Sequence, residues 1–207
     1  QAMGALNQAL EAGYADAPHL QRDEDLAALR DEPGFAALVT RAREQARRIA
    51  TAESGNWREI PGVRTITGYA DDGLAYRLRI SPQATKDKPA RLVVWLHPSG
   101  GSGNEAAENL AARLARNGFC LLVLTAKDFR GWSSDDIDKL MGPTLAQVAK
   151  IPEVDARRPL LMGYSAGGQA AIYLWHNNPS AFGGLILDAA YPIQVSPEGR
   201  MTRLKLP

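Results

Sequence analysis

The sequence predicts an α/β fold in three layers, in which helices cover both faces of a mostly parallel sheet and a helical segment precedes the sheet. From residue 63 onward, short apolar runs alternate with helix-like stretches at intervals that fit such a sheet. Residues 1–50 are instead rich in Ala, Leu, Arg and Glu and contain no strand-like run. We therefore divide the chain of 207 residues into a helical segment (1–50), a linker rich in turn-forming residues (51–62) and an α/β domain (63–207).

The helical segment is expected to contain two helices. Gly13 ends a first helix over residues 2–12, and Pro33 stands where a first-turn proline opens a second one. The second helix has a single apolar stripe at helical spacing, formed by Phe35, Leu38, Val39, Ala42, Ala46 and Ile49. The stretch from Leu10 to Leu38 resembles the closing unit of a tetratricopeptide array, and a generic helical cap fits it equally well. A single unit of this kind is too small to stand alone, so it must pack on the α/β domain or on upstream repeats.

Strand and helix patterns then follow in order through the α/β domain. Residues 63–70 and 74–80 alternate with period two around Asp71-Asp72-Gly73, which predicts a hairpin. Further strands are expected at 91–97, 119–124, 159–162 and 185–188. Helices are expected from Asn104 to Asn117 with Leu110 and Leu114 facing inward, at 135–150 with a kink at Gly142-Pro143, and at 166–175. Residues 189–207 show no further strand–helix unit.

Composition excludes several classes of function. The 24 Lys and Arg residues against 23 Asp and Glu leave the chain almost neutral, so its charge does not direct it to nucleic acid or to anionic membranes. No apolar stretch is long enough to span a bilayer. The single cysteine, Cys120, lies in an apolar run and is expected in the core rather than as a reactive thiol. Since the sequence has neither metal-ligand spacing nor a phosphate-binding glycine loop, we expect no cofactor and no metal, and a small neutral partner.

The pentapeptide Gly163-Tyr164-Ser165-Ala166-Gly167 is a G-x-S-x-G motif directly between an expected strand and an expected helix. A sharp turn at that position holds the serine in a strained backbone conformation and exposes its hydroxyl above the sheet. The turn needs small neighbours on both sides, and Gly163 and Gly167 provide them. We therefore predict that Ser165 is a catalytic nucleophile.

A second motif, WLHPSGG at residues 95–101, ends an apolar strand in a loop of small residues. Attack of a serine on a carbonyl group creates an alkoxide, which preorganised backbone N–H groups stabilise. We expect these oxyanion donors to be Ala166, directly after the serine, and either Ser99 or Gly100. Pro98 has no N–H, so the choice between the two loop amides stays open.

Both motifs, together with Val154-Asp-Ala-Arg157 and Gly168, resemble the esterase and depolymerase branch of the α/β-hydrolase superfamily over residues 63–192. Within it the chain looks most similar to polyhydroxybutyrate depolymerase-like and feruloyl esterase-like proteins, or to the related serine peptidases. The resemblance implies a three-layer α/β-hydrolase fold, here with an incomplete C-terminal part, and an oxyanion loop at 95–101. It further implies a serine carboxylic-ester hydrolase that forms an acyl-enzyme on Ser165 and acts on a small-molecule or polymeric ester. It also suggests a secreted or periplasmic location.

A serine nucleophile needs a histidine base and a carboxylate that orients the histidine. The chain has three histidines: His19 in the helical segment, His97 before the small-residue loop, which it is expected to hold, and His176, about 16 Å along the helix from the serine. In the superfamily both partners follow the serine in the chain, so they are expected beyond Asp188. Asp188 is itself a minority candidate for the acid.

Three explanations for the missing base stay open. The simplest is that the chain is a piece of a longer protein; alternatively a separate proteolytic fragment supplies the rest, or the fold is a non-catalytic remnant. In the last case the helical segment recruits a partner and the α/β domain serves as a scaffold or interaction module. Among enzymes, a serine peptidase of the same fold is the alternative, because the motifs do not distinguish an ester from a peptide substrate.

Several aromatic residues are candidates for substrate contacts. Phe129, Trp132 and Tyr164 lie in expected loops at the carboxyl ends of strands, where an open α/β sheet forms its ligand crevice. They either line a pocket for an acyl or aromatic ester group or pack beneath the loops. Tyr191-Pro192 occupies a similar position.

Overall fold

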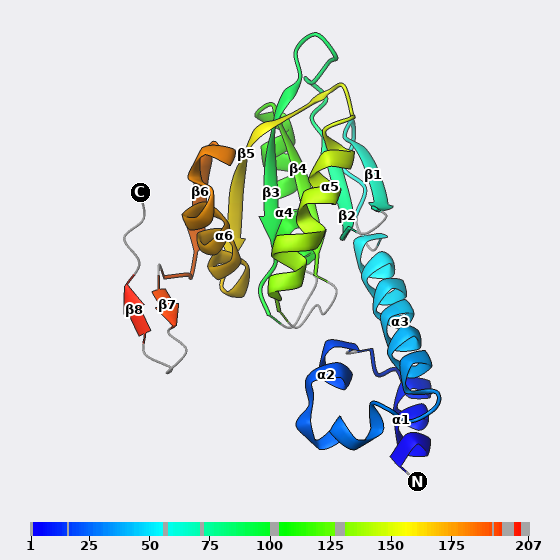
Figure 1. The fold of residues 1–207 in the computed structure, drawn as a ribbon. Helices are drawn as coiled ribbons and strands as arrows, with labels where there is room; N and C mark the ends of the chain where they lie inside the picture. Colours follow the sequence, from blue (N-terminus) through cyan, green and yellow to red (C-terminus); the bar gives the residue numbers. More distant parts are fainter. Residues whose placement is uncertain are drawn as a thin grey trace.

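A computed structural model describes residues 2–15, 17–55, 58–70, 73–99, 104–126, 131–191, 193–195 and 201–203. In this part of the chain six strands form one sheet, in the order β1-β2-β4-β3-β5-β6. Their bounds are Arg64–Tyr69 (β1), Ala75–Ile80 (β2), Ala90–Leu96 (β3), Phe119–Thr125 (β4), Val154–Tyr164 (β5) and Gly184–Asp188 (β6). β1 and β2 form the predicted hairpin and β2 pairs antiparallel with β4, whereas β4, β3, β5 and β6 are parallel to one another. The sheet is therefore mostly parallel, as predicted (Figure 1).

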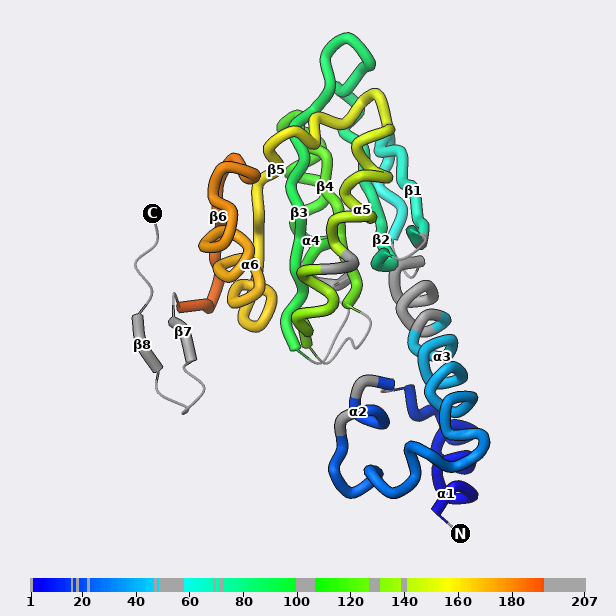
Figure 2. The backbone as a smooth tube through the Cα atoms, in the orientation of Figure 1, coloured from blue at the N-terminus to red at the C-terminus, as the bar shows by residue number. Residues whose placement is uncertain are grey.

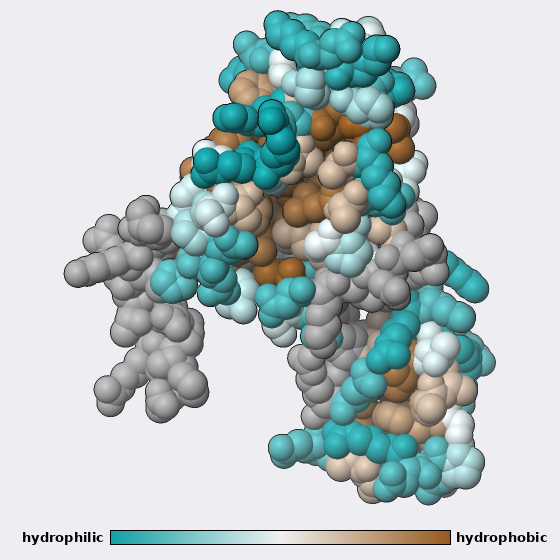
Figure 3. All heavy atoms as spheres, turned by 45° about the horizontal axis from the view of Figure 1, so that its top comes forward, coloured by the Kyte–Doolittle hydropathy of each residue, from teal (hydrophilic) through white to brown (hydrophobic). Residues whose placement is uncertain are grey.

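Helices cover both faces of this sheet (Figure 1). α5 (Met141–Val148) and α6 (Ala166–Asn177) pack on one face, over a core that includes Leu92. α4 (Asn104–Arg116) packs on the other face, against Trp95 and its apolar neighbours. β2, β3 and β4 are buried almost throughout because each face has its own helix layer. In the space-filling view of Figure 3, apolar side chains (brown) lie in the middle of the domain and polar ones (teal) surround them.

α4 approaches the sheet mainly through alanines. Ala107, Ala111 and Ala115 are at most 1% exposed. Leu110 and Leu114 contact the same core, as expected, but they are only partly buried at its edge. The small alanine side chains allow the helix axis to lie close to the strands, so the longer leucines are left to cover its flanks.

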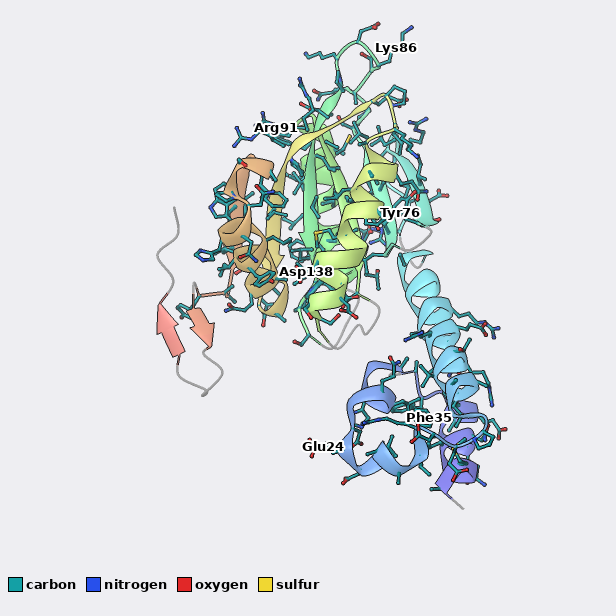
Figure 4. The ribbon with its side chains drawn as sticks, viewed as in Figure 1. Glu24, Phe35, Tyr76, Lys86, Arg91 and Asp138 are labelled. Atoms are coloured by element: carbon teal, nitrogen blue, oxygen red, sulfur yellow. The ribbon has the colours of Figure 1, made fainter. Side chains whose placement is uncertain are left out.

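The N-terminal helices form a core of their own. They are α1 (Ala2–Glu11), α2 (Ala17–Arg22), the 3-10 helix η1 (Glu24–Leu29) and α3 (Phe35–Gly55). The apolar stripe predicted for the second long helix is confirmed: Phe35, labelled in Figure 4, is 5% exposed, and all other stripe residues except Ile49, whose side chain lies outside the described part, are buried as well. The first four stripe residues, Phe35, Leu38, Val39 and Ala42, pack with buried residues of α1 and α2, which are Leu10, Ala17 and Leu20.

α3 connects this helical unit to the sheet. It continues to Gly55, beyond the boundary expected at residue 50, and it contacts β1, β2 and β4. The carbonyl of Arg58 then accepts a hydrogen bond from Arg79 Nη2 on β2, at 2.7 Å. Two expectations for this region stay predictions: the division of the chain at residues 50 and 62, and the resemblance to a tetratricopeptide repeat.

Two arginines are buried between β2 and α4. The side chains of Arg77 and Arg79 are 0% exposed and share the carboxylate of Glu108. Arg77 Nη2 lies 3.1 Å from Glu108 Oε1, and Arg79 Nη2 bonds Oε2 of the same carboxylate. Because a buried charge without a counter-charge costs several kcal/mol, the carboxylate of Glu108 stabilises both arginines in the fold.

The helix expected at 135–150 is irregular in its first part. A π-helical segment, η2 (Asp136–Leu140), precedes α5, and Gly142-Pro143 follows it closely. Pro143 has no N–H and its ring crowds the carbonyl four residues earlier, so the chain widens there to the i→i−5 pattern. The irregularity lies before Gly142-Pro143, within residues 136–140, and the kink predicted at Gly142-Pro143 itself stays a prediction.

The 3-10 helix η3 (Pro179–Ala181) leads from α6 to β6, and Figure 2 shows the path of the chain across the domain up to that strand. After it, β7 (Ile193–Val195) and β8 (Met201–Arg203) form a short antiparallel hairpin. The sequence pattern gave no signal for this hairpin, which is not a strand–helix unit. Within the described residues β6 stands at the edge of the main sheet. No helix in that part of the chain is both long and apolar enough to cross a bilayer.

Candidate active site

Ser165 occupies the turn between β5 and α6. Its backbone has φ 52° and ψ −116°, a region that residues other than glycine rarely adopt. Two hydrogen bonds hold the turn: the Ser165 N–H donates to the Asp188 carbonyl at 3.0 Å, and the Ser165 carbonyl accepts the Gln169 N–H at 3.1 Å. Ser165 is exposed at the carboxyl end of the parallel strands, where open α/β sheets bind their ligands.

The glycines around Ser165 are sterically required. A Cβ on Gly167 would lie 1.9 Å from the carbonyl oxygen of Leu96, and a Cβ on Gly163 would lie 2.3 Å from the carbonyl oxygen of Gly167. Gly168 is equally confined, because its Cβ would lie 2.3 Å from the Cβ of Ala190. The small neighbours predicted on both sides of the serine are therefore a packing requirement, and Gly168 adds a third position.

The loop after β3 lies beside this turn. Leu96, the last residue of β3, pairs with Gly163 in β5. The close approach of Gly167 to the carbonyl oxygens of Leu96 and His97 also brings the first turn of α6 against the same backbone. Residues 97–99 therefore leave the sheet next to the serine.

The predicted N–H donors belong to these two neighbouring segments. Ala166 is the first residue of α6, and the first amides of a helix have no partner within the helix. Ser99 is exposed in the loop after β3. Gly100 lies outside the described residues. Ser165 and Ala166 thus follow the carboxyl end of β5, and Ser99 lies in the loop that follows the carboxyl end of its neighbour β3.

His97 is completely buried beneath this loop. Its Nδ1 lies 2.7 Å from the Pro98 carbonyl oxygen, and its Nε2 accepts the N–H of Ala126 at 3.1 Å. Burial lowers the pKa of His97, and the hydrogen bond with the Pro98 carbonyl and then the nearby charge of Asp136 oppose this effect. With both ring nitrogens engaged, His97 holds the loop, as expected from the sequence, and it is not available as a base for Ser165.

The other two histidines lie away from the serine. His19 Nε2 is 3.2 Å from Asp23 Oδ2 within the helical unit. His176 is exposed in the last turn of α6, about 16 Å of helix rise from Ser165. None of the three histidines of the chain is placed to take a proton from Ser165.

Asp188, the candidate acid, ends β6 opposite Tyr164 in the register with β5. Its side chain is exposed, and the contact recorded with Ser165 is made by its backbone carbonyl. The next residue, Ala189, has φ 49°, so the chain turns sharply directly after the strand. Asp188 therefore lies at the same edge of the sheet as the serine, without a histidine to orient.

The aromatic candidates differ in exposure. Tyr164 is 37% and Tyr191 74% exposed at this edge. Trp132 is partly buried and its ring packs on His97 with ring centres 4.8 Å apart, which favours the packing alternative for this residue. Phe129 lies outside the described residues.

Gln169 belongs to no sequence motif, yet its Nε2 donates a hydrogen bond to the Tyr191 carbonyl at 3.0 Å. Its spacing of four from the serine on one helix is the signal that indicates a shared face.

No protein-family model and no curated protein matches the chain. Among solved structures it is similar to an S-formylglutathione hydrolase from Agrobacterium tumefaciens, with 12% sequence identity and a TM-score of 0.51, over 63% of this chain and 59% of that one. It is also similar to a ferulic acid esterase from Anaeromyces mucronatus (13% identity, TM-score 0.47, 62% of this chain and 59% of that one). A dipeptidyl aminopeptidase IV-type protein from Bacteroides ovatus matches with 20% identity and a TM-score of 0.44, over 60% of this chain and 20% of that one.

The chain therefore spans 59% of the length of the first two of these proteins and 20% of the third. Together with the sheet order and the helices on both faces, the similarity to the S-formylglutathione hydrolase shows that the chain has the three-layer α/β-hydrolase fold. At 12% identity the similarity concerns the fold alone.

Proposed function

We propose that this chain is the nucleophile-bearing part of a serine hydrolase that cleaves carboxylic esters through an acyl-enzyme on Ser165. The observation that carries the proposal is the turn at Ser165, where an exposed serine with φ 52° is framed by glycines that leave no room for a side chain. Backbone strain of this kind costs stability, so it is expected where a hydroxyl has to be presented to a substrate. In the α/β-hydrolase fold the nucleophile elbow stands at this strand–helix turn.

The proposed reaction has two halves. Ser165 Oγ bonds to the carbonyl carbon of the ester while a base takes its proton, and the carbonyl oxygen becomes an oxyanion. When the bond to the leaving oxygen breaks, the alcohol departs with that proton and the acyl group stays on Ser165. Water then attacks the acyl-enzyme in the same way, which releases the acid and restores the serine hydroxyl. An oxyanion hole formed by the N–H groups of Ala166 and of Ser99 or Gly100 stabilises the oxyanion, and one such donor lowers the barrier by about 3 kcal/mol.

We propose that the base is a histidine from outside these 207 residues. His97 is bonded at both nitrogens, and His19 and His176 lie away from the serine. The edge of β6 supports this proposal, because a further parallel strand can pair there and would end beside Asp188 and Ser165. The orienting carboxylate is Asp188 or comes from the same external segment, either in a longer protein or in a separate fragment.

The exposed aromatic side chains favour an ester with an apolar or aromatic group. Tyr164 directly precedes the nucleophile, and Tyr191 is held near it through the bond from Gln169 to its carbonyl. Flat apolar rings beside the reacting bond bind such groups by burying their surface. The substrate is either a small ester or the chain of a polyester. A serine peptidase of the same fold is the alternative, because amides react by the same attack.

The second candidate function is a non-catalytic scaffold or interaction module. The observation that favours it is that none of the three histidines reaches Ser165. In that case the helical unit, whose stripe residues include Phe35 and Leu38, holds a partner and the α/β domain only carries it.

A fluorophosphonate probe tests the proposal, because it forms a covalent bond only with an activated serine. The 207-residue chain, the full-length protein and a Ser165→Ala variant of the latter are treated with the probe, and the adduct is located by peptide mass mapping. We expect labelling of Ser165 in the full-length protein alone. Labelling in the short chain as well would show that the base lies within it, and the absence of labelling in every sample would favour the scaffold.

A further inference from the structure

His97 joins three segments that are far apart in the sequence. It directly follows β3, its Nε2 accepts the N–H of Ala126 after β4, and its own carbonyl accepts the Nε1–H of Trp132 at 2.9 Å. Its Nδ1 lies 2.7 Å from the carbonyl oxygen of Pro98. The side chain and the backbone of one residue therefore fix the start of the loop from both sides.

These contacts determine which nitrogen of the ring carries the proton. The N–H of Ala126 can only donate, so Nε2 of His97 must be free of a proton to accept it. The carbonyl oxygen of Pro98 can only accept, so Nδ1 must be the protonated nitrogen. Protonation of both would place the Nε2–H of His97 against the N–H of Ala126. The burial that lowers the pKa of the ring acts in the same direction, and Asp136 is the charge that opposes it.

The direction of the Pro98 carbonyl determines the direction of the next amide. In a trans peptide unit the C=O and the N–H point in opposite directions, and the bond between Pro98 and Ser99 is not cis. Because the Pro98 carbonyl points to His97, the N–H of Ser99 points away from the buried ring. Ser99 is exposed, and the carbonyl oxygen of His97, two residues earlier, faces the first turn of α6.

We infer that His97 is a positioning residue: its neutral, Nδ1-protonated ring turns the Pro98–Ser99 peptide so that Ser99, rather than Gly100, donates the second N–H to the oxyanion. This role rests on the proposed function of Ser165. Ala166 provides the first donor from α6, and Trp132 holds the loop from the other side by its bond to the His97 carbonyl.

Two substitutions of His97 separate this role from simple packing. In His97→Asn, the side-chain N–H can still donate to the Pro98 carbonyl, whereas in His97→Gln the longer side chain reaches towards Ala126 and loses that bond. In the full-length protein we expect His97→Gln to lower kcat for a chromogenic ester about 100-fold with little change in KM, because the oxyanion exists only in the transition state. His97→Asn should stay within about tenfold of the wild type, and urea unfolding should show similar stability losses in both.

A Ser99→Pro background tests the amide itself, because proline has no N–H. Ser99→Pro alone should cost about 100-fold in kcat, and adding His97→Gln should cost less than about threefold more, since the amide that His97 directs is already gone. Equal losses of kcat in His97→Asn and His97→Gln, or fully additive losses in the double variant, would refute the role of His97.

Nitrogen NMR of the isotope-labelled full-length protein gives a readout that does not depend on activity. We expect the His97 ring to show a protonated Nδ1 and an unprotonated Nε2 from neutral pH down to mildly acidic pH. The opposite tautomer, or a doubly protonated ring at neutral pH, would overturn the inference even if Ser165 reacts with the fluorophosphonate probe. Absence of Ser165 labelling in the wild type would refute the proposed function, and this role of His97 with it.

Discussion

Replacement of Gly167 by alanine tests whether the turn at Ser165 depends on close contact between α6 and the loop after β3. The new Cβ would lie 1.9 Å from the carbonyl oxygen of Leu96 and 2.6 Å from that of His97. Since such contacts do not fall below 3.0 Å, one of the two backbones would have to move by about 1.1 Å. Leu96 is paired in the centre of the sheet and cannot shift alone. We expect a loss of about 3 kcal/mol in the free energy of unfolding, at the upper end for overpacked sites.

Gly142→Ala is the matched control. A Cβ at Gly142 has no atom within 4 Å, and the residue lies in α5. Alanine is the better helix former, so this variant should gain about 0.5 to 1 kcal/mol. Urea unfolding followed by tryptophan fluorescence gives the free energy of unfolding of both variants. The rate of fluorophosphonate labelling shows whether Ser165 is still aligned to react.

In the folded full-length protein, Gly167→Ala should label at Ser165 about 100-fold more slowly than the wild type, because a displacement of about 1 Å removes the alignment of the serine. Gly142→Ala should label at the wild-type rate. A Gly167→Ala variant that unfolds within about 1 kcal/mol of the wild type and labels normally would show that the contact between α6 and the loop is not needed, and the steric reasoning would be wrong.

Three further predictions follow from buried groups. Glu108→Gln removes a carboxylate charge that two buried guanidinium groups share, and it should cost about 3 kcal/mol of stability. Glu153→Gln, whose ion pair is exposed, should cost less than about 1 kcal/mol. Equal losses in urea unfolding would contradict this reasoning. Burial lowers the pKa of His97, so the ring stays neutral in the native protein at a pH where the unfolded chain already binds a proton, below about pH 6.5. The free energy of unfolding should therefore fall as the pH drops from about 7.5 to 5.5. His97→Asn should reduce that slope, and an unchanged slope would show that another group causes it. Cys120 is 0% exposed and burial raises the pKa of its thiol, so iodoacetamide should modify the native protein about 100-fold more slowly than the urea-unfolded one; fast modification of the native protein would place the thiol outside the core.

The local parts of the fold follow from the sequence because they depend on residues close together in the chain. The alternation before and after residues 71–73 predicted the hairpin of β1 and β2, and the turn signals predicted the ends of two helices. Gly13 and Gly118 end these helices with φ of 106° and 79°, which only glycine adopts at little cost. The boundary of α3 was less predictable, since the helix as a whole contacts three strands of the sheet, and tertiary contacts of this kind stabilise a helix independently of its own sequence signals.

The long-range contacts could not be read from the sequence. Arg77 and Arg79 alternate with apolar residues, which is typical of a strand with one face in water. In the structure both are buried, because α4 packs over that face and its Glu108 pairs with both guanidinium groups. Neither the helix that covers a strand nor the carboxylate that reaches it is encoded in the strand itself.

The same distinction holds at the candidate active site. The turn at Ser165 was determined by the sequence alone, because its requirements, a strand, two flanking glycines and a helix, lie within a few residues of the serine. The direction of the Ser99 amide was decided only by the tertiary structure. Packing brings Ala126 and Trp132, 29 and 35 residues further along the chain, against His97, and the orientation of a peptide group depends on such partners rather than on the residues that form it.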